Sequence, residues 1–354
     1  MDLPLVYCEH PGERHLLVVD GVLPGSAASL SHWPGNGTPD AWRHALSTGI
    51  AMNFVAAPAA EQRAFLAGID GVANNHYDTD GVLALFTLYH PGLALAHRAR
   101  LERWATAGDY FRVPDEEAFL ADALITAYAD PARSPIAASL AGLQDSERYL
   151  AATRALFARI PEWLQSGIGD EAQAGRPALE CLRRDQEVLR SASAVPLVHL
   201  DLMVFELPQG NAELPGRHAL FEAADCDRAL LFAPGPGGVR TRLCFSTRSW
   251  FDAPGRHALP RPDFAPLLLT LNREEGVAAS DEFAWRAQNP ASASPELWFG
   301  RAGLPLFESH SDAWLVPSGL GIERIKGAIL ETLRDAWVFD KEDDTTDLED
   351  IFAV

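Results

Sequence analysis

His76, Asp78 and Asp80 alternate along the chain, and Gly81 and an apolar run beginning at Val82 follow them. If this segment is extended, side chains two residues apart point to the same side, so one imidazole and two carboxylates converge on one point. Such groups repel one another when they are buried without partners, and a divalent cation is the usual way to hold them together. Gly81 is expected to let the backbone turn sharply before a helix starts. The segment therefore predicts a metal site.

The same three residues allow a simpler interpretation, in which the acids cap the helix that follows. Asp is a favoured N-cap residue, and Asp80 stands where the N-cap of a helix starting after Gly81 would be. Three potential ligands in alternation, preceded by Asn74 and Asn75, are more than a cap requires.

Other candidates follow the predicted strands. His32 comes after an expected strand at residues 27–30, and loops at the carboxyl ends of strands form the ligand crevice of open α/β sheets. His32 is therefore a candidate catalytic or ligating residue. Asp109, in an expected turn at 108–111 after a helix, is a further candidate, and Asp20, after an expected strand at 15–19, ranks below it. A histidine in such a position is also often merely hydrogen-bonded. An oxygen-rich site with one or two imidazoles favours Mn²⁺ or Mg²⁺, and the four scattered cysteines form no thiolate zinc site.

Arg240, Arg242 and Arg248 lie on or near one expected strand in the second half of the chain. Arg240 and Arg242 share a face by the period of two, and Arg248 joins them if the strand stays extended. Arginines on one face suit a carboxylate or phosphate, so the three are candidate substrate-binding residues. The alternative is a solvent face paired with this protein's own carboxylates.

The elements that must position these residues alternate between strand, loop and helix, which predicts the α/β class. We expect an N-terminal α/β domain at 1–114, a helical connecting region at 115–191 and a C-terminal α/β domain at 192–338, with the active site in the cleft between the two α/β domains. Glycines and prolines at 234–238 predict a hairpin connection. Residues 339–354 form an acidic tail that is expected to be disordered; its apolar end could instead dock on a partner protein or a neighbouring subunit.

Composition limits the classes of partner. The 354 residues carry a formal net charge of −20, which disfavours duplex nucleic acid but leaves room for a small anionic substrate held through a metal. No run of apolar residues is long enough to span a membrane and the first residues do not resemble a signal peptide, so a cytoplasmic protein is expected.

Two stretches resemble DHH-type phosphoesterases. Residues 76–86 are similar to that superfamily's acidic motif, in which an Asp-x-Asp-Gly-like run after a strand binds Mn²⁺. Residues 229–249 look like its substrate domain, where a Gly-Gly-x-Arg-x-Arg-like strand and a following Arg-Ser meet a phosphate or carboxylate. The chain contains no Asp-His-His triplet and no Gly-Gly-Gly-His signature.

Five short motifs are spread over most of the chain. They are a Ser-His-Trp-Pro-Gly segment, an Asn-Asn-His-x-Asp-x-Asp-Gly segment, a Gly-Asp turn, a Tyr-Ala-Asp-Pro-x-x-Ser-Pro run and an Arg-Ser-Trp-Phe-Asp run, at residues 31–35, 74–81, 108–109, 128–135 and 248–252. In these motifs the chain resembles a bacterial family of uncharacterised proteins, DUF6687. That resemblance supports the boundaries of the motifs and implies no activity.

These observations favour a divalent-metal-dependent hydrolase of a phosphoester, which would use a metal-activated water. Two alternatives stay open. One is a non-catalytic interaction protein with a degenerate metal site and a partner-binding acidic tail. The other is a metal-dependent hydrolase of a non-phosphate bond, such as an amide, which would not need the arginines.

Overall fold

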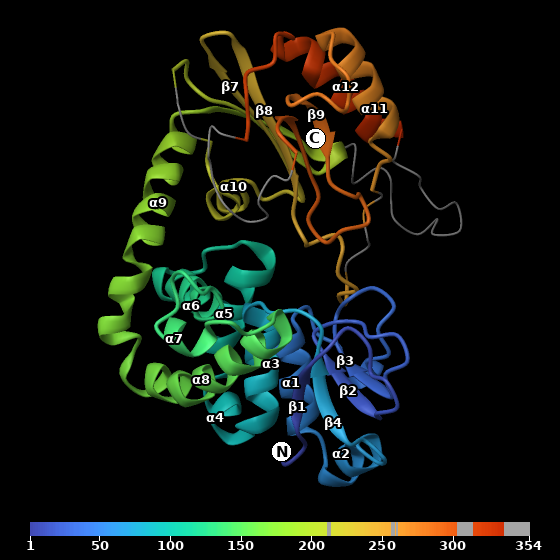
Figure 1. Cartoon of the computed structure of the whole chain (residues 1–354), viewed down its shortest axis with the longest axis vertical. Coiled ribbons are helices and arrows are strands. Elements are labelled where there is room, and N and C mark those ends of the chain that lie inside the picture. The colour runs from blue at the N-terminus through green and yellow to red at the C-terminus, as the bar shows by residue number, and fades with distance from the viewer. Residues whose placement is uncertain (211–213, 256–258, 260, 303–313, 336–354) are drawn as a thin grey trace. The chain divides into compact units, whose positions relative to one another are not determined.

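The computed structural model describes residues 1–210, 214–255, 259, 261–302 and 314–335 of the chain (Figure 1). It divides into two compact units. The first comprises Met1–Glu180 and Phe251–His257, and the second comprises Cys181–Trp250 and Ala258–Val354. Helices and sheets are mixed in both, which confirms the α/β class. The helical residues 115–180, expected as a connecting region, fall within the first unit.

The sheet of the first unit consists of four short parallel strands. They are β1 (Leu5–Tyr7), β2 (Leu16–Val19), β3 (Ala28–Leu30) and β4 (Gly71–Asn74), in the order β1-β4-β2-β3. Continuous apolar runs such as that of β2 are typical of parallel strands buried on both faces, and every residue of β2 and β4 is buried. Because all four strands are parallel, their carboxyl ends lie along the same edge of the sheet.

Two helices, α1 (Ser47–Ala56) and α3 (Thr79–Tyr89), pack on one face of this sheet (Figure 1). Ile50 and Phe54 of α1 and Leu85 of α3 meet Leu17 and Val72 of the strands in one buried cluster. The other helices of this unit are α2 (Ala59–Phe65), α4 (Pro91–Ala96), α5 (Arg98–Tyr110), α6 (Glu116–Tyr128), α7 (Ala137–Leu140) and α8 (Asp145–Ser166), with the 3-10 turns Asp40–Trp42 and Gly169–Glu171.

The second unit contains a six-stranded mixed sheet. Its strands are β5 (Ser193–Leu197), β6 (Leu202–Glu206), β7 (Arg228–Gly235), β8 (Gly238–Phe245), β9 (Ala284–Ala287) and β10 (Glu296–Gly300), in the order β5-β6-β7-β8-β10-β9. Only β6 and β7 are parallel neighbours among these pairs. The hairpin expected at 234–238 joins β7 to β8, with Gly235 opposite Gly238.

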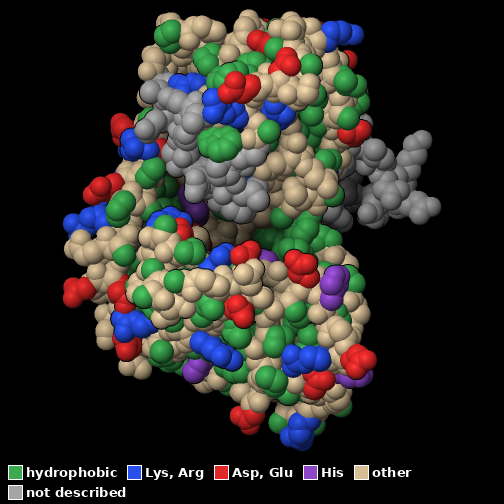
Figure 2. Space-filling model, viewed as in Figure 1, with side chains coloured by type: hydrophobic (Ala, Val, Ile, Leu, Met, Phe, Trp, Pro, Cys, Tyr) green, Lys and Arg blue, Asp and Glu red, His purple; other side chains and the backbone are tan. Residues whose placement is uncertain are grey.

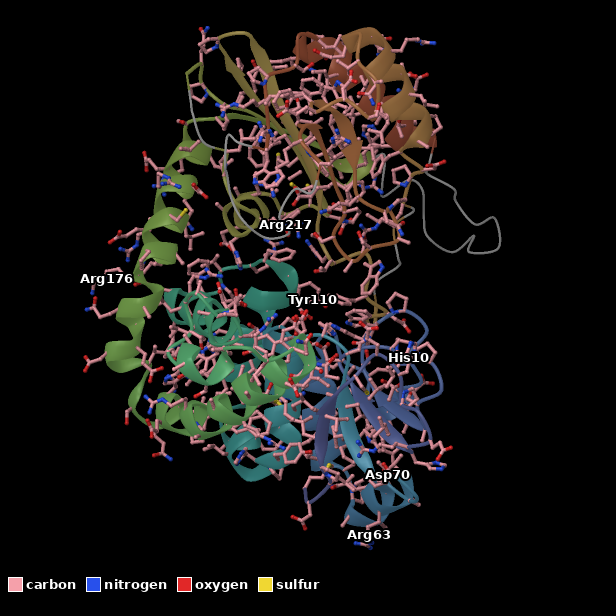
Figure 3. All side chains as sticks on the ribbon, in the orientation of Figure 1. His10, Arg63, Asp70, Tyr110, Arg176 and Arg217 are labelled. Carbon is pink, nitrogen blue, oxygen red and sulfur yellow. The ribbon has the colours of Figure 1, made fainter. Side chains whose placement is uncertain are left out.

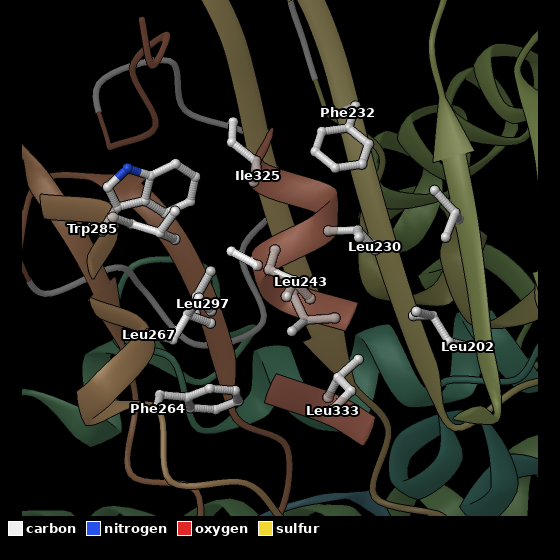
Figure 4. Packing of buried hydrophobic residues seen from close by; sticks show 14 of the residues in the cluster. Leu202, Leu230, Phe232, Leu243, Phe264, Leu267, Trp285, Leu297, Ile325 and Leu333 are labelled. Carbon is white, nitrogen blue, oxygen red and sulfur yellow. The ribbon is translucent and has the colours of Figure 1, made fainter. Parts of the chain in front are cut away.

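One face of this second sheet is covered by α11 (Ala265–Glu275) and α12 (Ile322–Asp335), as Figure 4 shows. Leu267 of α11 and Ile325 of α12 pack there against Leu230, Leu243 and Leu297 of the strands. The remaining helical segments are α9 (Ala172–Arg190), which crosses the boundary between the units along the chain, the 3-10 turn Val198–Leu200 and α10 (Arg217–Ala223).

Among the described residues, no helix is both long and apolar enough to cross a membrane. The acidic tail at 339–354 lies outside the described residues. On the face that Figure 2 shows, the acidic and basic side chains of the described residues are interspersed.

Candidate metal centre

Three polar residues follow the carboxyl ends of neighbouring parallel strands in the first unit. Asp20 comes directly after β2, His32 after β3 and His76 after β4. Asp20 has a φ of 53°, a left-handed conformation that costs free energy in a residue other than glycine and is often retained at functional sites. The edge of the sheet thus brings together residues that are far apart in the sequence.

The first cluster consists of Asp20, His32, Asp80 and Asp109, all of them buried. Nε2 of His32 lies 3.4 Å from Oδ1 of Asp20, 3.2 Å from Oδ2 of Asp109 and 3.8 Å from Oδ2 of Asp80. One atom from each residue lies within 4.8 Å of the others. We call this group the buried cluster.

The second cluster shares Asp20 with the first and adds His76 and Asp78. Nε2 of His76 lies 3.4 Å from Oδ2 of Asp20 and 2.9 Å from Oδ2 of Asp78. The side chains of His76 and Asp78 are 25% and 36% exposed, so this group opens toward solvent. We call it the open cluster.

A hydrogen bond at Nδ1 fixes the orientation of each imidazole ring. Nδ1 of His32 lies 2.6 Å from the carbonyl oxygen of Ala45, which can only accept, so Nδ1 donates this hydrogen bond and Nε2 is the nitrogen that faces the carboxylates. Nδ1 of His76 lies 2.9 Å from Oδ1 of Asn75 in the same way. Partners of this kind fix the tautomer and ring orientation of metal-ligating histidines.

Asp80 is anchored by a helix other than its own. Its carboxylate accepts hydrogen bonds from the backbone amides of Ser47 at 2.6 Å and Thr48 at 2.8 Å. These amides open α1, whose N-cap residue Leu46 has no side chain able to cap it. Asp80 therefore satisfies the free amides of α1, where the helix dipole favours a negative charge.

The predicted geometry of the acidic motif is wrong in one respect. β4 ends at Asn74 and α3 already begins at Thr79, so the segment does not stay extended through Asp80. As a result Asp80 joins the buried cluster, whereas His76 and Asp78 join the open one. The cap was also misplaced: Asp78, not Asp80, is the N-cap of α3 and accepts from the amide of Gly81 at 2.8 Å.

Gly81 serves a purpose other than the predicted turn, because it lies within α3. A Cβ at this position would stand 2.8 Å from Oδ2 of Asp20, 2.5 Å from Nδ2 of Asn74 and 3.0 Å from Oδ1 of Asp78. The absent side chain makes room for the carboxylate that both clusters share.

The acids of the site resist ionising together. Burial, reinforced by the charge of Asp20, raises the pKa of Asp80 to about 6 and also raises the pKa of Asp78. Burial and the charge of Asp80 raise the pKa of Asp109 well above its ordinary value. Burial opposes charge on Asp20 too, but the two imidazoles beside it outweigh that effect and lower its pKa. A cation between these carboxylates would relieve the repulsion.

The donors present fit a hard divalent cation. Both carboxylate oxygens of Asp20 and Nε2 of His32 are buried without a hydrogen-bond partner, which is costly for polar atoms unless a ligand satisfies them. Carboxylate oxygens combined with imidazole nitrogen suit Mn²⁺ or Mg²⁺ better than a thiolate-preferring metal.

The arginines predicted to bind substrate lie in the second unit and have different surroundings. Arg242 is buried and donates from Nε and Nη2 to the carboxylate of Glu296 at 2.7 and 2.8 Å, and Arg217, labelled in Figure 3, donates to the same carboxylate. Arg242 thus has a structural role in place of the predicted substrate contact. Arg248 pairs with Asp225 at 3.0 Å. Substrate binding by Arg240 and Arg248 stays a prediction.

Sequence reasoning ranked Asp20 too low. A signal was present, since Asp20 follows a buried parallel strand just as His32 and His76 do. The hydrogen bonds from the amides of Ser47 and Thr48 to Asp80 could not be predicted, because the tertiary fold decides which backbone groups a side chain reaches.

The comparisons with known proteins are sparse. No curated protein matches the sequence significantly. Among solved structures, the pGpG-specific phosphodiesterase PggH from Vibrio cholerae aligns over 94% of this chain and 86% of its own, with 8% identity and a TM-score of 0.39. The model of a family of unknown function, DUF6687, matches residues 5–344. The chain therefore belongs to the DUF6687 family.

Proposed function

We propose that this protein is a divalent-metal-dependent hydrolase that acts on a phosphoester, with its metal centre in the first unit. The observation that supports this proposal most directly is the position of Asp20. One of its carboxylate oxygens faces the buried cluster and the other faces the open cluster. Asp20 would thus be a ligand in both groups, and the two groups together would hold two divalent cations. Paired metals of this kind are common in phosphoester-cleaving enzymes.

The charge of the clusters supports two divalent cations. Asp20, Asp78, Asp80 and Asp109 contribute −4 when they are all ionised, and two divalent cations contribute +4. His32, Asp80 and Asp109 would hold one cation together with Asp20, and His76 and Asp78 would hold the other. The catalytic assignment of His32 and Asp109 thus becomes a ligand assignment.

When bound, such cations supply an acidified water and a counter-charge for a phosphoryl group. The residues of this chain keep the centre ready for that chemistry. Ala45 and Asn75 hold the two imidazoles with Nε2 inward, and the amides of Ser47 and Thr48 hold Asp80. Because the side chains of His76 and Asp78 are partly exposed, a small anionic substrate would approach from the side of the open cluster.

The resemblance of residues 76–86 to the acidic motif of DHH-type phosphoesterases favours a phosphoester over an amide. The interaction-protein alternative would keep the cation and lack turnover, with the acidic tail as its partner-binding segment.

The test is hydrolysis of bis(4-nitrophenyl) phosphate by the full chain in the presence of Mn²⁺, beside a peptide 4-nitroanilide. We expect turnover of the phosphodiester that falls by about 100-fold or more in Asp109→Asn. Glu61→Gln, an exposed acid on α2, is the matched control and should keep full activity. Cleavage of the anilide alone would support the amide alternative, and bound metal without turnover of either substrate would support the interaction protein.

A further inference from the structure

A short segment of the first unit is supplied from a distant part of the chain. The chain enters the second unit after Glu180, returns to the first unit at Phe251 and leaves it again after His257. The residue before this segment, Trp250, donates from its indole Nε1 to the carbonyl of Ala291 at 3.0 Å, within the second unit.

Phe251 lies directly against a residue of the buried cluster. Its ring stacks on the imidazole of His32 with the centroids 3.7 Å apart and the planes inclined by 17°. His32 is fully buried and Phe251 is 5% exposed. The ring of Tyr110, on α5 (Figure 3), meets Phe251 edge-on at 5.7 Å and 81°. One face of the imidazole is therefore covered by a flat aromatic surface that is itself held in place.

The same segment also holds the backbone of His32. The amide of Asp252 donates to the carbonyl oxygen of His32 at 2.7 Å. The carboxylate of Asp252 lies 3.4 Å from Nη1 of Arg43 and 3.5 Å from Nδ2 of Asn36, contacts that are exposed and long and hence weak. The specific restraints that this segment places on His32 are therefore the stacked ring of Phe251 and the main-chain hydrogen bond from Asp252.

These contacts oppose a rotation of the His32 imidazole that would move Nε2 out of the buried cluster. If the imidazole turned about its bond to Cβ, Nδ1 would leave the carbonyl of Ala45 and Nε2 would leave the carboxylates of Asp20 and Asp109. A stacked ring at van der Waals distance opposes that rotation, since an imidazole standing across it would overlap it. A leucine or methionine in its place fills space without offering a flat face.

We propose that Phe251 is a positioning residue for the metal centre: it fixes His32 so that Nε2 faces the buried cluster. This inference rests on the proposed metal centre. It makes the buried cluster dependent on a segment whose chain continues into the second unit at both ends. Because a bound cation and a docked segment would each favour the ordered imidazole, each should strengthen the other.

The experiment is Mn²⁺ titration of the full chain, with free Mn²⁺ counted by its EPR signal. Phe251→Leu should weaken one of the two binding events by roughly 10–100-fold and leave the other near its wild-type affinity. Phe251→Tyr keeps a flat ring and should retain the wild-type affinity. Phe65→Leu is the matched control, because Phe65 packs against Trp42 and Phe54 in the same unit, within an apolar core cluster that includes none of the candidate ligands.

The outcomes separate the two proposals. Wild-type protein that binds no Mn²⁺ would contradict the metal centre itself. Two bound ions in the wild type with unchanged affinities in Phe251→Leu would overturn the positioning role alone, as would equal losses in Phe251→Leu and Phe65→Leu. Thermal unfolding in EDTA checks that the variants are folded. Phe251→Met repeats the comparison of Mn²⁺ affinity with the wild type, using a side chain that fills more of the space left by the ring.

Discussion

Oδ1 of Asp20 lies 3.4 Å from Nε2 of His32, and Oδ2 of the same carboxylate lies 3.4 Å from Nε2 of His76. One aspartate in a left-handed conformation therefore joins a buried group of candidate ligands to a partly exposed one. This relationship makes the two clusters one centre, and it gives each substitution around it a distinct expected effect.

Gly81→Ala should abolish or severely weaken metal binding although alanine is the better helix former, by about 1 kcal/mol. The added methyl group would stand 2.8 Å from Oδ2 of Asp20, on a carboxylate that is buried and cannot move aside without leaving its cluster. Mn²⁺ titration and circular dichroism of the variant test this expectation.

Gly92→Ala is the control for that experiment. Gly92 lies in helix α4, and a Cβ there would meet no atom within 4 Å. We expect unchanged metal binding and equal or greater thermal stability. If Gly81→Ala bound Mn²⁺ as tightly as Gly92→Ala, the close packing of Asp20 against α3 would not matter for the centre.

Metal uptake should release protons at pH 7. Burial lowers the pKa of both histidines, but the carboxylates around them outweigh it and raise each pKa well above 6.5, while burial and Asp20 raise that of Asp80 to about 6. A cation must displace these protons, so the apparent affinity should rise as pH increases from 6 through 8, with about one to two protons released per ion at pH 7.

Calorimetric titration with Mn²⁺ in two buffers of different ionisation enthalpy measures that release. A binding heat that is independent of the buffer, together with an affinity that is flat from pH 6 to 8, would mean that protonated groups do not hold the metal.

Glu296→Gln should destabilise the second unit by about 3–5 kcal/mol, because it leaves the guanidinium groups of Arg217 and Arg242 buried without their carboxylate. Denaturant unfolding measures this loss. Glu274→Gln is the control: its partner Arg324 is at the surface, so little change is expected. Equal stability of Glu296→Gln and the wild type would refute the structural role given to Arg242.

The contribution of Glu296 to the free energy of unfolding should depend on pH. Burial alone would raise the pKa of Glu296, but Arg242 and Arg217 lower it from 4.5 to about 2. The unfolded chain therefore binds this proton at a higher pH than the native protein does. The resulting stability, about 3 kcal/mol, is present above pH 4.5 and is lost as the pH falls toward 2. The difference in unfolding free energy between wild type and Glu296→Gln should shrink across this window and stay constant from pH 5 to 7.

The sequence was sufficient to predict the α/β class, the strands that precede Asp20 and His32, and the hairpin at 234–238. Apolar runs and turn residues are local signals, and the strands of both sheets follow them. His32, singled out because it follows a strand, and Asp109 both lie in the buried cluster.

The division of the motif between two clusters could not be predicted. It depends on α3 starting at Thr79 and on the amides of α1 holding Asp80, which are tertiary relationships. Arg242 was misjudged for the same reason, since its partner Glu296 comes from a strand far along the chain. Phe251 stands in the Arg-Ser-Trp-Phe-Asp run of the family resemblance, but its contact with His32 could not be predicted, because nothing in the sequence says that a segment after β8 returns to the first unit.

The most direct test of the central claim is the Mn²⁺ content of the full chain at equilibrium, compared between wild type, Asp20→Asn and Asp78→Asn. The two clusters predict about two ions per chain in the wild type, about one in Asp78→Asn and fewer than one in Asp20→Asn. Equal metal content in Asp20→Asn and the wild type, or no metal in any of the three, would contradict a centre built around Asp20.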